Sequence, residues 1–283
     1  MPTRPAYWSA ERGVMKNLLQ PDLDGSWRRG EMDLHYQPEF TIRDRKLVGF
    51  EALARWNHPI FGVVPPSSFI PIAEATGLIA PLGAWVLENA CRRAAAWQKN
   101  DPSVGIAVNV SALQIARDDF VSTVLNTVER TGIAPGLLQL ELTESALLTD
   151  LDQAAEKMQK LRAMRIAISI DDFGTGYSSS AYLDKLPFTT LKLDRSFAQD
   201  LGARSGAFVE SVVRLAHRLG MDVVVEGIES GRQLRAARES GCDQVQGFLL
   251  GRPTSRPEAF LPSNSLITNA DLSFASGTQA KAA

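Results

Sequence analysis

Short apolar runs alternate with stretches of helical periodicity through most of the chain. Eight of the runs have the length and composition of buried strands: 34–40, 48–55, 104–110, 137–143, 166–171, 190–194, 222–226 and 244–249. Six helical stretches fall between most of them: 69–75, 82–98, 118–131, 152–164, 205–219 and 232–240. Glycines follow several helical stretches, as at Gly132, Gly220 and Gly241, which is typical of helix C-termini.

Repeated strand-then-helix units predict a parallel sheet, and eight strands in a chain of 283 residues predict that this sheet closes into a barrel. The first two strands are separated by residues 41–46 only. That connection is too short for a crossover helix, so the first pair should be antiparallel. The predicted fold is therefore α/β, a modified TIM-type (β/α)8 barrel with an antiparallel first strand.

The two ends of the chain differ from the strand-and-helix pattern. Residues 1–23 form an N-terminal segment with a short helix over 10–19, before the break Pro-Asp-Leu-Asp-Gly. Residues 24–262 form the barrel domain, and 263–283, rich in Ser, Ala, Thr and Asn, form a flexible C-terminal tail. We expect the N-terminal segment to be too short for an attached sensory or cyclase domain.

Composition narrows the function. A net charge of −2 gives no general attraction to DNA, RNA or membrane surfaces. No apolar run is long enough to span a bilayer and no signal peptide is visible, so we expect a cytoplasmic protein. The two cysteines and three histidines are scattered, which argues against a disulfide framework and against zinc sites of the Cys/His kind.

Polar side chains recur near the C-terminal ends of the predicted strands. Successive side chains of a strand point to opposite faces, so each strand divides into an aliphatic set and a second set that should face the barrel axis. The second set supplies Glu51, Asn109, Glu141, Asp171, Lys192, Glu226 and Gln246. The C-terminal rim is where barrel enzymes place their chemistry.

Four carboxylates at one rim would repel each other unless cations neutralise them. Carboxylate and amide oxygens suit hard ions such as Mg²⁺ or Mn²⁺, and Asp172 beside Asp171 adds a ligand for a second ion. The alternative is a rim of salt bridges to Lys192, Arg55 and other bases. Seven polar residues at equivalent positions on seven strands favour the metal site.

The motifs at these positions resemble those of the EAL-domain family, the bacterial cyclic-di-GMP phosphodiesterases. The similarity runs in order from about residue 31 to about residue 261. It includes Gly49-Phe-Glu-Ala-Leu-Ala-Arg-Trp56, Asn109-Val-Ser111, Glu141-Leu-Thr-Glu144, Asp171-Asp-Phe-Gly-Thr-Gly-Tyr-Ser-Ser179, Leu191-Lys-Leu-Asp194, Glu226-Gly-Ile-Glu229 and Gln246-Gly247.

The resemblance implies a role for each residue. One metal would be held by Glu51, Asn109, Glu141 and Asp171, and the second by Asp171, Asp172 and Glu226. Lys192 would orient and activate the attacking water, so that Lys192, Glu226 and Glu51 form the catalytic set. Substrate would be contacted by Gln37, Leu53, Arg55, Asp194 and Gln246, and the loop after Asp172 would be supported by Glu144 and Glu229.

The resemblance also implies a reaction and an assembly. Two Mg²⁺ or Mn²⁺ ions would activate water to open one phosphodiester of cyclic-di-GMP, which gives linear 5′-pGpG. The loop 174–176 would position Asp171 and Asp172 and contribute to a homodimer interface. A catalytically silent cyclic-di-GMP receptor that acts through a protein partner is the alternative function, and a protein-interaction domain that ignores the nucleotide is a third.

One departure from the family pattern lies close to the predicted substrate contacts. Glu39 stands where the family usually has an aliphatic residue after Gln-Pro. Glu39 could alter substrate fit or simply face solvent, and we expect it to face solvent. His58 matches the usual Asn-His-Pro turn and should be structural.

Overall fold

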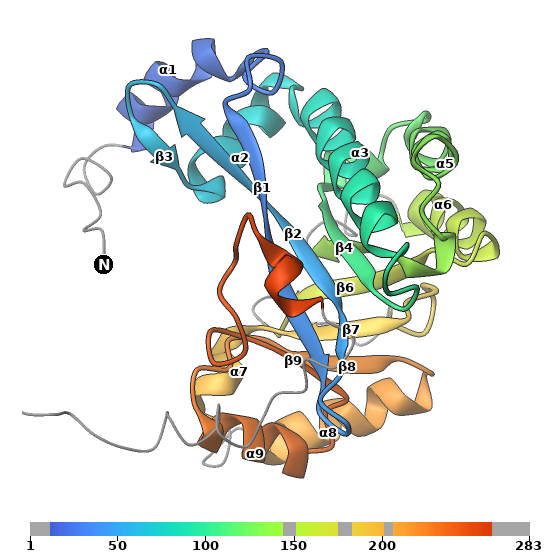
Figure 1. The fold of residues 1–283 in the computed structure, drawn as a ribbon. Coiled ribbons are helices and arrows are strands. Elements are labelled where there is room, and N and C mark those ends of the chain that lie inside the picture. The colour runs from blue at the N-terminus through green and yellow to red at the C-terminus, as the bar shows by residue number, and fades with distance from the viewer. Residues whose placement is uncertain (1–11, 144–150, 175–182, 201–205, 262–283) are drawn as a thin grey trace, which may run out of the picture.

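Eight strands close into a barrel in the computed structural model, which describes residues 12–143, 151–174, 183–200 and 206–261 (Figure 1). Around the barrel the order is β1-β9-β8-β7-β6-β5-β4-β2, and pairing of β1 with β2 closes the ring. The strands are β1 (Met32–Thr41), β2 (Leu47–His58), β4 (Gly105–Val110), β5 (Leu138–Thr143), β6 (Ala167–Phe173), β7 (Thr190–Leu193), β8 (Asp222–Val225) and β9 (Gln244–Gln246). β1 is antiparallel to both neighbours, β2 and β9, which confirms the predicted modified barrel.

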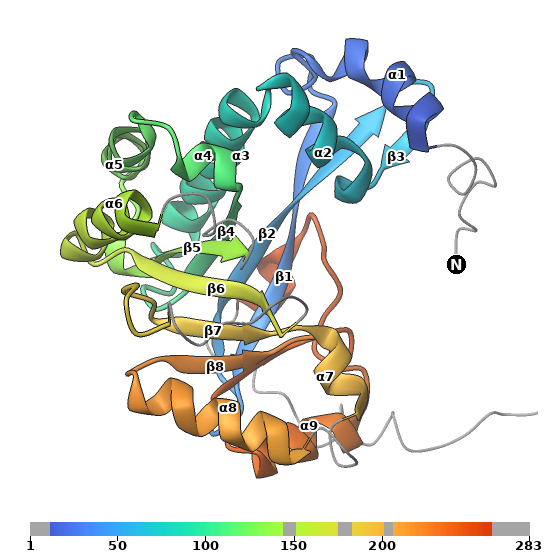
Figure 2. The same ribbon diagram turned by 180° about the vertical axis from the view of Figure 1, so that it is seen from behind.

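Most of the helices cover the outside of the barrel, whereas α1 (Arg12–Leu23) and α2 (Pro66–Thr76) lie beside the extended ends of β1 and β2 (Figures 1 and 2). The others are α3 (Ile79–Trp97), α4 (Ala112–Ile115), α5 (Phe120–Thr131), α6 (Leu151–Ala163), α7 (Arg195–Asp200), α8 (Gly206–Arg218) and α9 (Gly231–Glu239). The short elements α4, α7 and β3 (Gly62–Val64) lie outside the predicted set. None of the described helices combines the length and apolar character needed to cross a membrane.

The hydrophobic core lies between the strands and these helices. On β5 the outward-facing residues have at most 2% of their surface exposed: Leu138, Leu140 and Leu142. On α3 the facing residues recur at helical spacing and include Leu82 and Val86, which are also buried. Each fully buried leucine contributes about 2 kcal/mol to folding, so this layer fixes the strands and leaves the opposite face free for polar groups.

Helix α1 is longer than the sequence predicts, because it continues through Pro21 to Leu23 rather than ending near residue 19. Proline in the last turn removes only one backbone hydrogen bond of the helix. Leu19 and Leu23 are four residues apart and therefore on one face, and both are fully buried. Burial of these two side chains offsets the lost bond and extends the helix.

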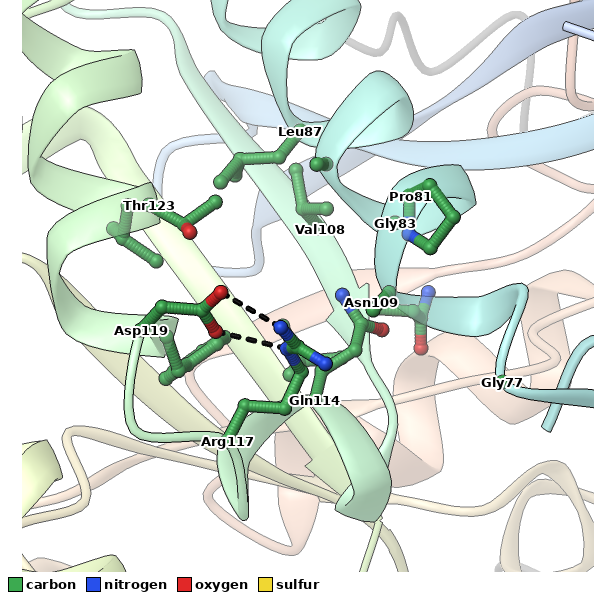
Figure 3. Close-up of a pocket in the computed structure, with 15 residues that line it drawn as sticks. Gly77, Pro81, Gly83, Leu87, Val108, Asn109, Gln114, Arg117, Asp119 and Thr123 are labelled. Carbon is green, nitrogen blue, oxygen red and sulfur yellow. Dashed lines mark hydrogen bonds and ion pairs between the residues drawn. The ribbon is translucent and has the colours of Figure 1, made fainter.

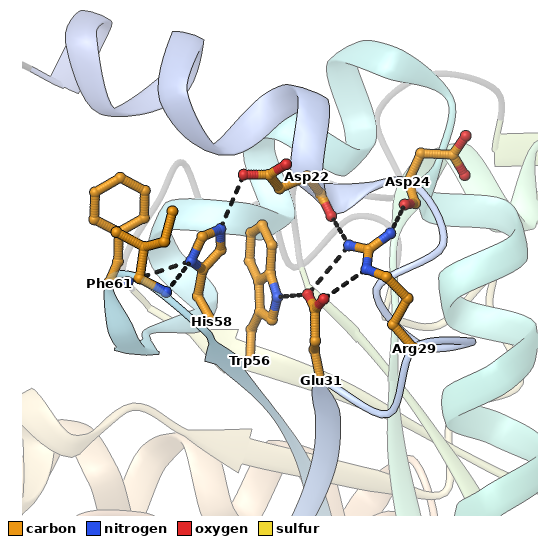
Figure 4. A network of polar contacts seen from close by, with 8 residues as sticks. Asp22, Asp24, Arg29, Glu31, Trp56, His58 and Phe61 are labelled. Atoms are coloured by element: carbon orange, nitrogen blue, oxygen red, sulfur yellow. Dashed lines mark hydrogen bonds and ion pairs between the residues drawn. The ribbon is translucent and has the colours of Figure 1, made fainter.

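A polar network anchors the end of α1 to β2 (Figure 4). Nδ1 of the buried His58 accepts hydrogen bonds from the backbone N–H groups of Ile60 (3.1 Å) and Phe61 (3.3 Å). The ring proton therefore resides on Nε2, which donates to Asp22 Oδ2 at 3.2 Å. The neighbouring Trp56 Nε1 donates to Glu31 at 3.0 Å. The structural role expected for His58 agrees with these contacts.

His58→Ala should lower the free energy of unfolding by about 2–3 kcal/mol, because it leaves a cavity and two unsatisfied backbone donors. Asp22→Ala should cost less than about 1 kcal/mol, since Asp22 is half exposed. Urea unfolding of both variants checks this expectation. Equal losses in the two variants would contradict the role assigned to the His58 ring.

Candidate active site

The inward polar side chains meet around the ammonium group of Lys192, on β7. The Lys192 side chain is fully buried, and its Nζ lies 2.7 Å from Glu141 Oε1 and 2.7 Å from Glu226 Oε1. Three further carboxylates lie within 4.0 Å of the same nitrogen: Glu51 at 3.7 Å, Glu39 at 3.8 Å and Asp171 at 3.9 Å. We call these five acids and Lys192 the Lys192 cluster. Its members come from β1, β2, β5, β6 and β7 and from the end of β8, so the barrel itself assembles it.

Glu51 is held by amide groups from two other strands. Asn109 Nδ2 donates to Glu51 Oε1 at 2.6 Å, and Gln246 Nε2 donates to Glu51 Oε2 at 2.9 Å. Burial raises the pKa of Glu51, but the charge of Lys192 and these two donors together lower it by more. The net pKa therefore lies below its usual value. Glu51 is therefore the acid of the cluster that is best stabilised as a carboxylate.

The other acids carry more charge than one ammonium can balance. Burial raises the pKa of Glu226 to about 8, despite the opposing effect of Lys192. Burial likewise raises the pKa of Glu141 well above its usual value, and the nearby charges of Glu51 and Asp171 raise it further. The cluster therefore attracts protons or other cations at neutral pH.

Adjacent Asp171 and Asp172 lie at a distortion of β6. The pairing of β6 with β7 shifts register between Ile170 and Phe173, and Asp172 has a φ of 54°, in the left-handed region. In a regular strand two successive side chains would point to opposite faces. Burial raises the pKa of both aspartates, and each is raised further by neighbouring carboxylates, Asp171 acting on Asp172. The distortion thus keeps both acids in one electrostatic environment.

Two glycines shape the turns that follow Glu226 and Gln246. Gly227 has a φ of 72°, and a Cβ at this position would lie 2.4 Å from Arg195 Cβ. A Cβ at Gly247 would lie 2.2 Å from the backbone nitrogen of Ile228. The close approach lets Ile228 N–H donate to Gln246 O at 3.0 Å, which fixes both strand ends beside the cluster.

The predicted substrate contacts line β1 and β2. Gln37 lies opposite Glu51 in the β1–β2 register, and its Nε2 donates to Gly251 O at 3.2 Å. Leu53 and Arg55 follow Glu51 at two-residue spacing, so the three share one face of β2, and both are partly buried. Together they form a strip that leads from the cluster toward the end of the strand.

Asp194 and Glu229 lie in the connections between strands and the helices that follow them. Asp194 precedes α7, and its Oδ1 accepts a hydrogen bond from Ser196 N at 2.9 Å, as an N-cap does. Glu229 is exposed immediately before Ser230, the N-cap of α9. Glu144 and most of the loop after Asp172 lie outside the described residues, so the support predicted for this loop stays a prediction.

The expectation that Glu39 faces solvent is wrong, because its exposed fraction is only 4%. Gln37 and Glu39 lie two residues apart on β1 and so share the face toward the axis, whereas Pro38 and Phe40 are buried on the other face. Burial raises the pKa of Glu39 to about 7, although Lys192 opposes the shift. The alternation that identified the other inward acids also identifies this one, once it is applied to β1.

The donor set fits hard divalent cations. The inward ligands are carboxylate and amide oxygens, and Glu141 Oε2 and Gln246 Oε1 accept no hydrogen bond within the described residues. The acids converge on the ammonium, and no three His, Cys, Asp or Glu side chains in the described ranges already meet in the geometry of a metal site. Cations can therefore bind only if some of these acids give up their contact with the Lys192 ammonium and contact the metal instead.

The raised pKa values predict a pH dependence for the stability of chelator-treated protein. Acids whose pKa is higher in the folded state bind more protons than the unfolded chain, here between the usual value of 4.5 and about 8 for Glu226. Stability should therefore fall as the pH rises from 5.5 to 7.5, by about 2.7 kcal/mol for each net proton. The lowered pKa of Glu51 acts below this window.

Thermal unfolding across this pH range, with and without Mn²⁺, measures the effect. A loss of about 3 kcal/mol corresponds to roughly 6–12 °C for a domain of this size. Saturating Mn²⁺ should reduce the slope, because bound cations replace the protons. A melting temperature that rises with pH in the chelated protein would contradict the excess of negative charge.

A separate hollow of about 340 Å³ lies against β4, between α3, α4 and α5 (Figure 3). It is lined largely by apolar residues such as Leu87, Val108 and Val124. Its lining carboxylate, Asp119, is paired with Arg117 at 2.7 Å. It touches the candidate site only through Asn109 and offers no set of metal ligands among its described residues.

Comparison with known proteins agrees with this arrangement. The family model described as EAL domain matches residues 20–253. The bifunctional diguanylate cyclase/cyclic di-GMP phosphodiesterase MucR of Pseudomonas aeruginosa is 43% identical over 238 residues, which cover 83% of this chain and 35% of MucR. The cyclic di-GMP phosphodiesterase NbdA of the same organism is 39% identical over 245 residues, covering 86% of this chain and 31% of NbdA.

Solved structures show the same fold. The phosphodiesterase of PaMucR in complex with c-di-GMP is 42% identical and superimposes with a TM-score of 0.81, covering 86% of this chain and 99% of that one. The EAL enzyme Bd1971, bound to cAMP and cyclic-di-GMP, is 29% identical with a TM-score of 0.82, covering 89% and 70%. The chain spans about a third of the length of the curated relatives it matches.

Proposed function

Because this chain belongs to the EAL domain family, we propose that it hydrolyses cyclic di-GMP to linear 5′-pGpG in a reaction that depends on divalent cations. The observation that supports this function most strongly is the Lys192 cluster. Its buried carboxylates exceed the charge of one ammonium, and they lie in a chain similar to two proteins named as cyclic di-GMP phosphodiesterases.

Two cations would be held by oxygen ligands at the barrel mouth. Glu51, Asn109, Glu141 and Asp171 would hold the first, and Asp171, Asp172 and Glu226 the second. Bound Mg²⁺ or Mn²⁺ would lower the pKa of a ligated water and neutralise charge on the phosphate. Asp171 belongs to both sets, consistent with its place beside the distortion of β6.

The side chains of the chain supply orientation and charge. Lys192 would hold the attacking water in line with the scissile bond and neutralise charge that develops on phosphorus. The water oxygen bonds to phosphorus, the bond from phosphorus to the 3′-oxygen breaks, and that oxygen leaves with a proton. The substrate would be held along the strip formed by Gln37, Leu53 and Arg55, with Asp194 and Gln246 as further contacts.

The test is a hydrolysis assay with the purified chain. Cyclic di-GMP is incubated with protein and Mn²⁺ or Mg²⁺, with and without chelator, and the products are separated by chromatography. We expect 5′-pGpG to accumulate only when the cation is free to bind. Saturable binding of cyclic di-GMP without turnover under both cations would contradict the proposal and would identify a silent receptor instead.

A further inference from the structure

Glu39 differs from the other acids of the Lys192 cluster. Among the described residues it is the one carboxylate within 4.0 Å of the ammonium that belongs to neither proposed ligand set. Its Oε1 is buried and accepts no hydrogen bond from the described residues. A buried carboxylate oxygen without a hydrogen-bond donor is costly, and the contact of Oε1 with Lys192, at 3.8 Å, offsets part of that cost.

Strand register places Glu39 below Glu51 along β2, and on its other side Glu39 pairs with Gln246 of β9. Gln37 pairs with Glu51, and Glu39 pairs with Gly49 two residues farther from the mouth. One such step along a strand is roughly 6–7 Å. Lys192 therefore contacts Glu51 nearer the mouth end of β2 and Glu39 one step farther from it.

This position matters when cations bind. In the structure the ammonium is closest to Glu141 and Glu226, and both are proposed metal ligands. Cations that take these oxygens would leave a fully buried ammonium without its nearest partners. Such a charge is strongly destabilising unless another anion compensates it. Glu39, 3.8 Å from the Lys192 ammonium, can compensate this charge.

Building on the proposed function, we propose that Glu39 is a positioning residue, which holds the Lys192 ammonium on the inner side of the cluster while cations occupy the acids at the mouth. It acts through Lys192 and touches neither substrate nor metal. Without Glu39, Lys192 stays with Glu141 and Glu226 and competes with the cations for them.

A double-mutant cycle separates this role from a direct one. Glu39→Gln keeps the shape of the side chain and removes its charge, and Lys192→Met removes the ammonium. Calorimetric titration with Mn²⁺ should give a dissociation constant about ten-fold higher for Glu39→Gln than for the parent. In the Lys192→Met background the same substitution should change it less than about two-fold. An equal weakening in both backgrounds would overturn the proposal, because Glu39 would then act on the metal directly.

Steady-state kinetics provide a second readout that does not need the Lys192 variant. At saturating Mn²⁺, Glu39→Gln should lower kcat about ten-fold and leave KM within about two-fold. Glu39→Asp retains the charge and should recover part of kcat. Thr190→Val, which removes a part-buried hydrogen bond from β7 to Gln139 of β5, should leave kcat unchanged. A kcat for Glu39→Gln equal to that of the parent would overturn the proposal.

The proposed function and the proposed role of Glu39 can be contradicted by different results. A parent protein that binds Mn²⁺ but does not hydrolyse cyclic di-GMP would contradict the proposed function, whereas the Mn²⁺ cycle would still report on Glu39. A parent that hydrolyses the nucleotide, together with a Glu39→Gln variant indistinguishable from it, would contradict only the role of Glu39.

Discussion

Replacement of Glu51 with alanine is expected to abolish the hydrolysis of cyclic di-GMP, with a loss of at least about 1,000-fold in kcat/KM. Glu51 is a proposed ligand of the first cation and accepts hydrogen bonds from both Asn109 and Gln246. The substitution would remove a ligand and release two amide groups that the carboxylate orients. Product formation followed by chromatography at saturating Mn²⁺ measures the effect.

Glu156→Ala is the matched control for this experiment. Glu156 lies on α6, its side chain is 67% exposed, and it pairs only with Lys160 among the contacts of the described chain. The same chemical change at this position should leave hydrolysis unaltered. A Glu51→Ala protein that keeps its fold by circular dichroism and more than about a tenth of parental activity would show that this carboxylate is no essential ligand.

Lys192→Met is expected to produce the largest loss of stability, about 3–5 kcal/mol in the presence of chelator at pH 8. The ammonium is the one cationic group within 4.0 Å of five described carboxylates, and its removal leaves their repulsion uncompensated. Mn²⁺ should restore much of the stability, since cations replace the missing charge. Lower pH should also restore it, because protonation neutralises the acids.

Lys157→Met is the control for Lys192→Met, because it removes a buried ammonium that lies outside the Lys192 cluster. Lys157 is also buried, but its Nζ donates to the backbone oxygens of Ile115 (2.9 Å), Ala116 (3.0 Å) and Arg117 (2.9 Å). Its removal should destabilise the protein without recovery on addition of Mn²⁺. Urea unfolding of both variants, with chelator and with Mn²⁺, makes the comparison. Equal recovery in the two variants, or recovery in neither, would contradict the electrostatic account of the Lys192 cluster.

The barrel could be predicted because its strands and helices have strong, different periodicities. Buried strands such as β5 and β6 appear as apolar runs between turn residues, and the short link after β1 indicates an antiparallel pair. The elements α4, α7 and β3 are only 4, 6 and 3 residues long, which is too short for a periodic signal. The extension of α1 through Pro21 depends on tertiary burial of Leu19 and Leu23, which local propensity does not report.

The candidate site was predictable as a set of side chains on one face, because alternation along a strand places them there. Its internal contacts were not. The hydrogen bond between Glu51 and Gln246 joins residues 195 positions apart, and the two oxygens of Glu51 are shared between β4 and β9 by barrel closure. The family pattern does not indicate the buried place of Glu39, whereas the alternation of side chains along β1 does.

The most direct test of the account is the number of cations that the cluster binds. Calorimetric titration of chelator-treated protein with Mn²⁺ at pH 7.5 should show two ions bound per chain. Their binding should release protons from the acids of raised pKa. Asp171→Asn, which alters the ligand proposed for both ions, should lose the two-ion stoichiometry. Titration that shows no Mn²⁺ bound by the parent chain, or two ions bound equally well by Asp171→Asn, would contradict the central claim that these carboxylates form a two-cation site.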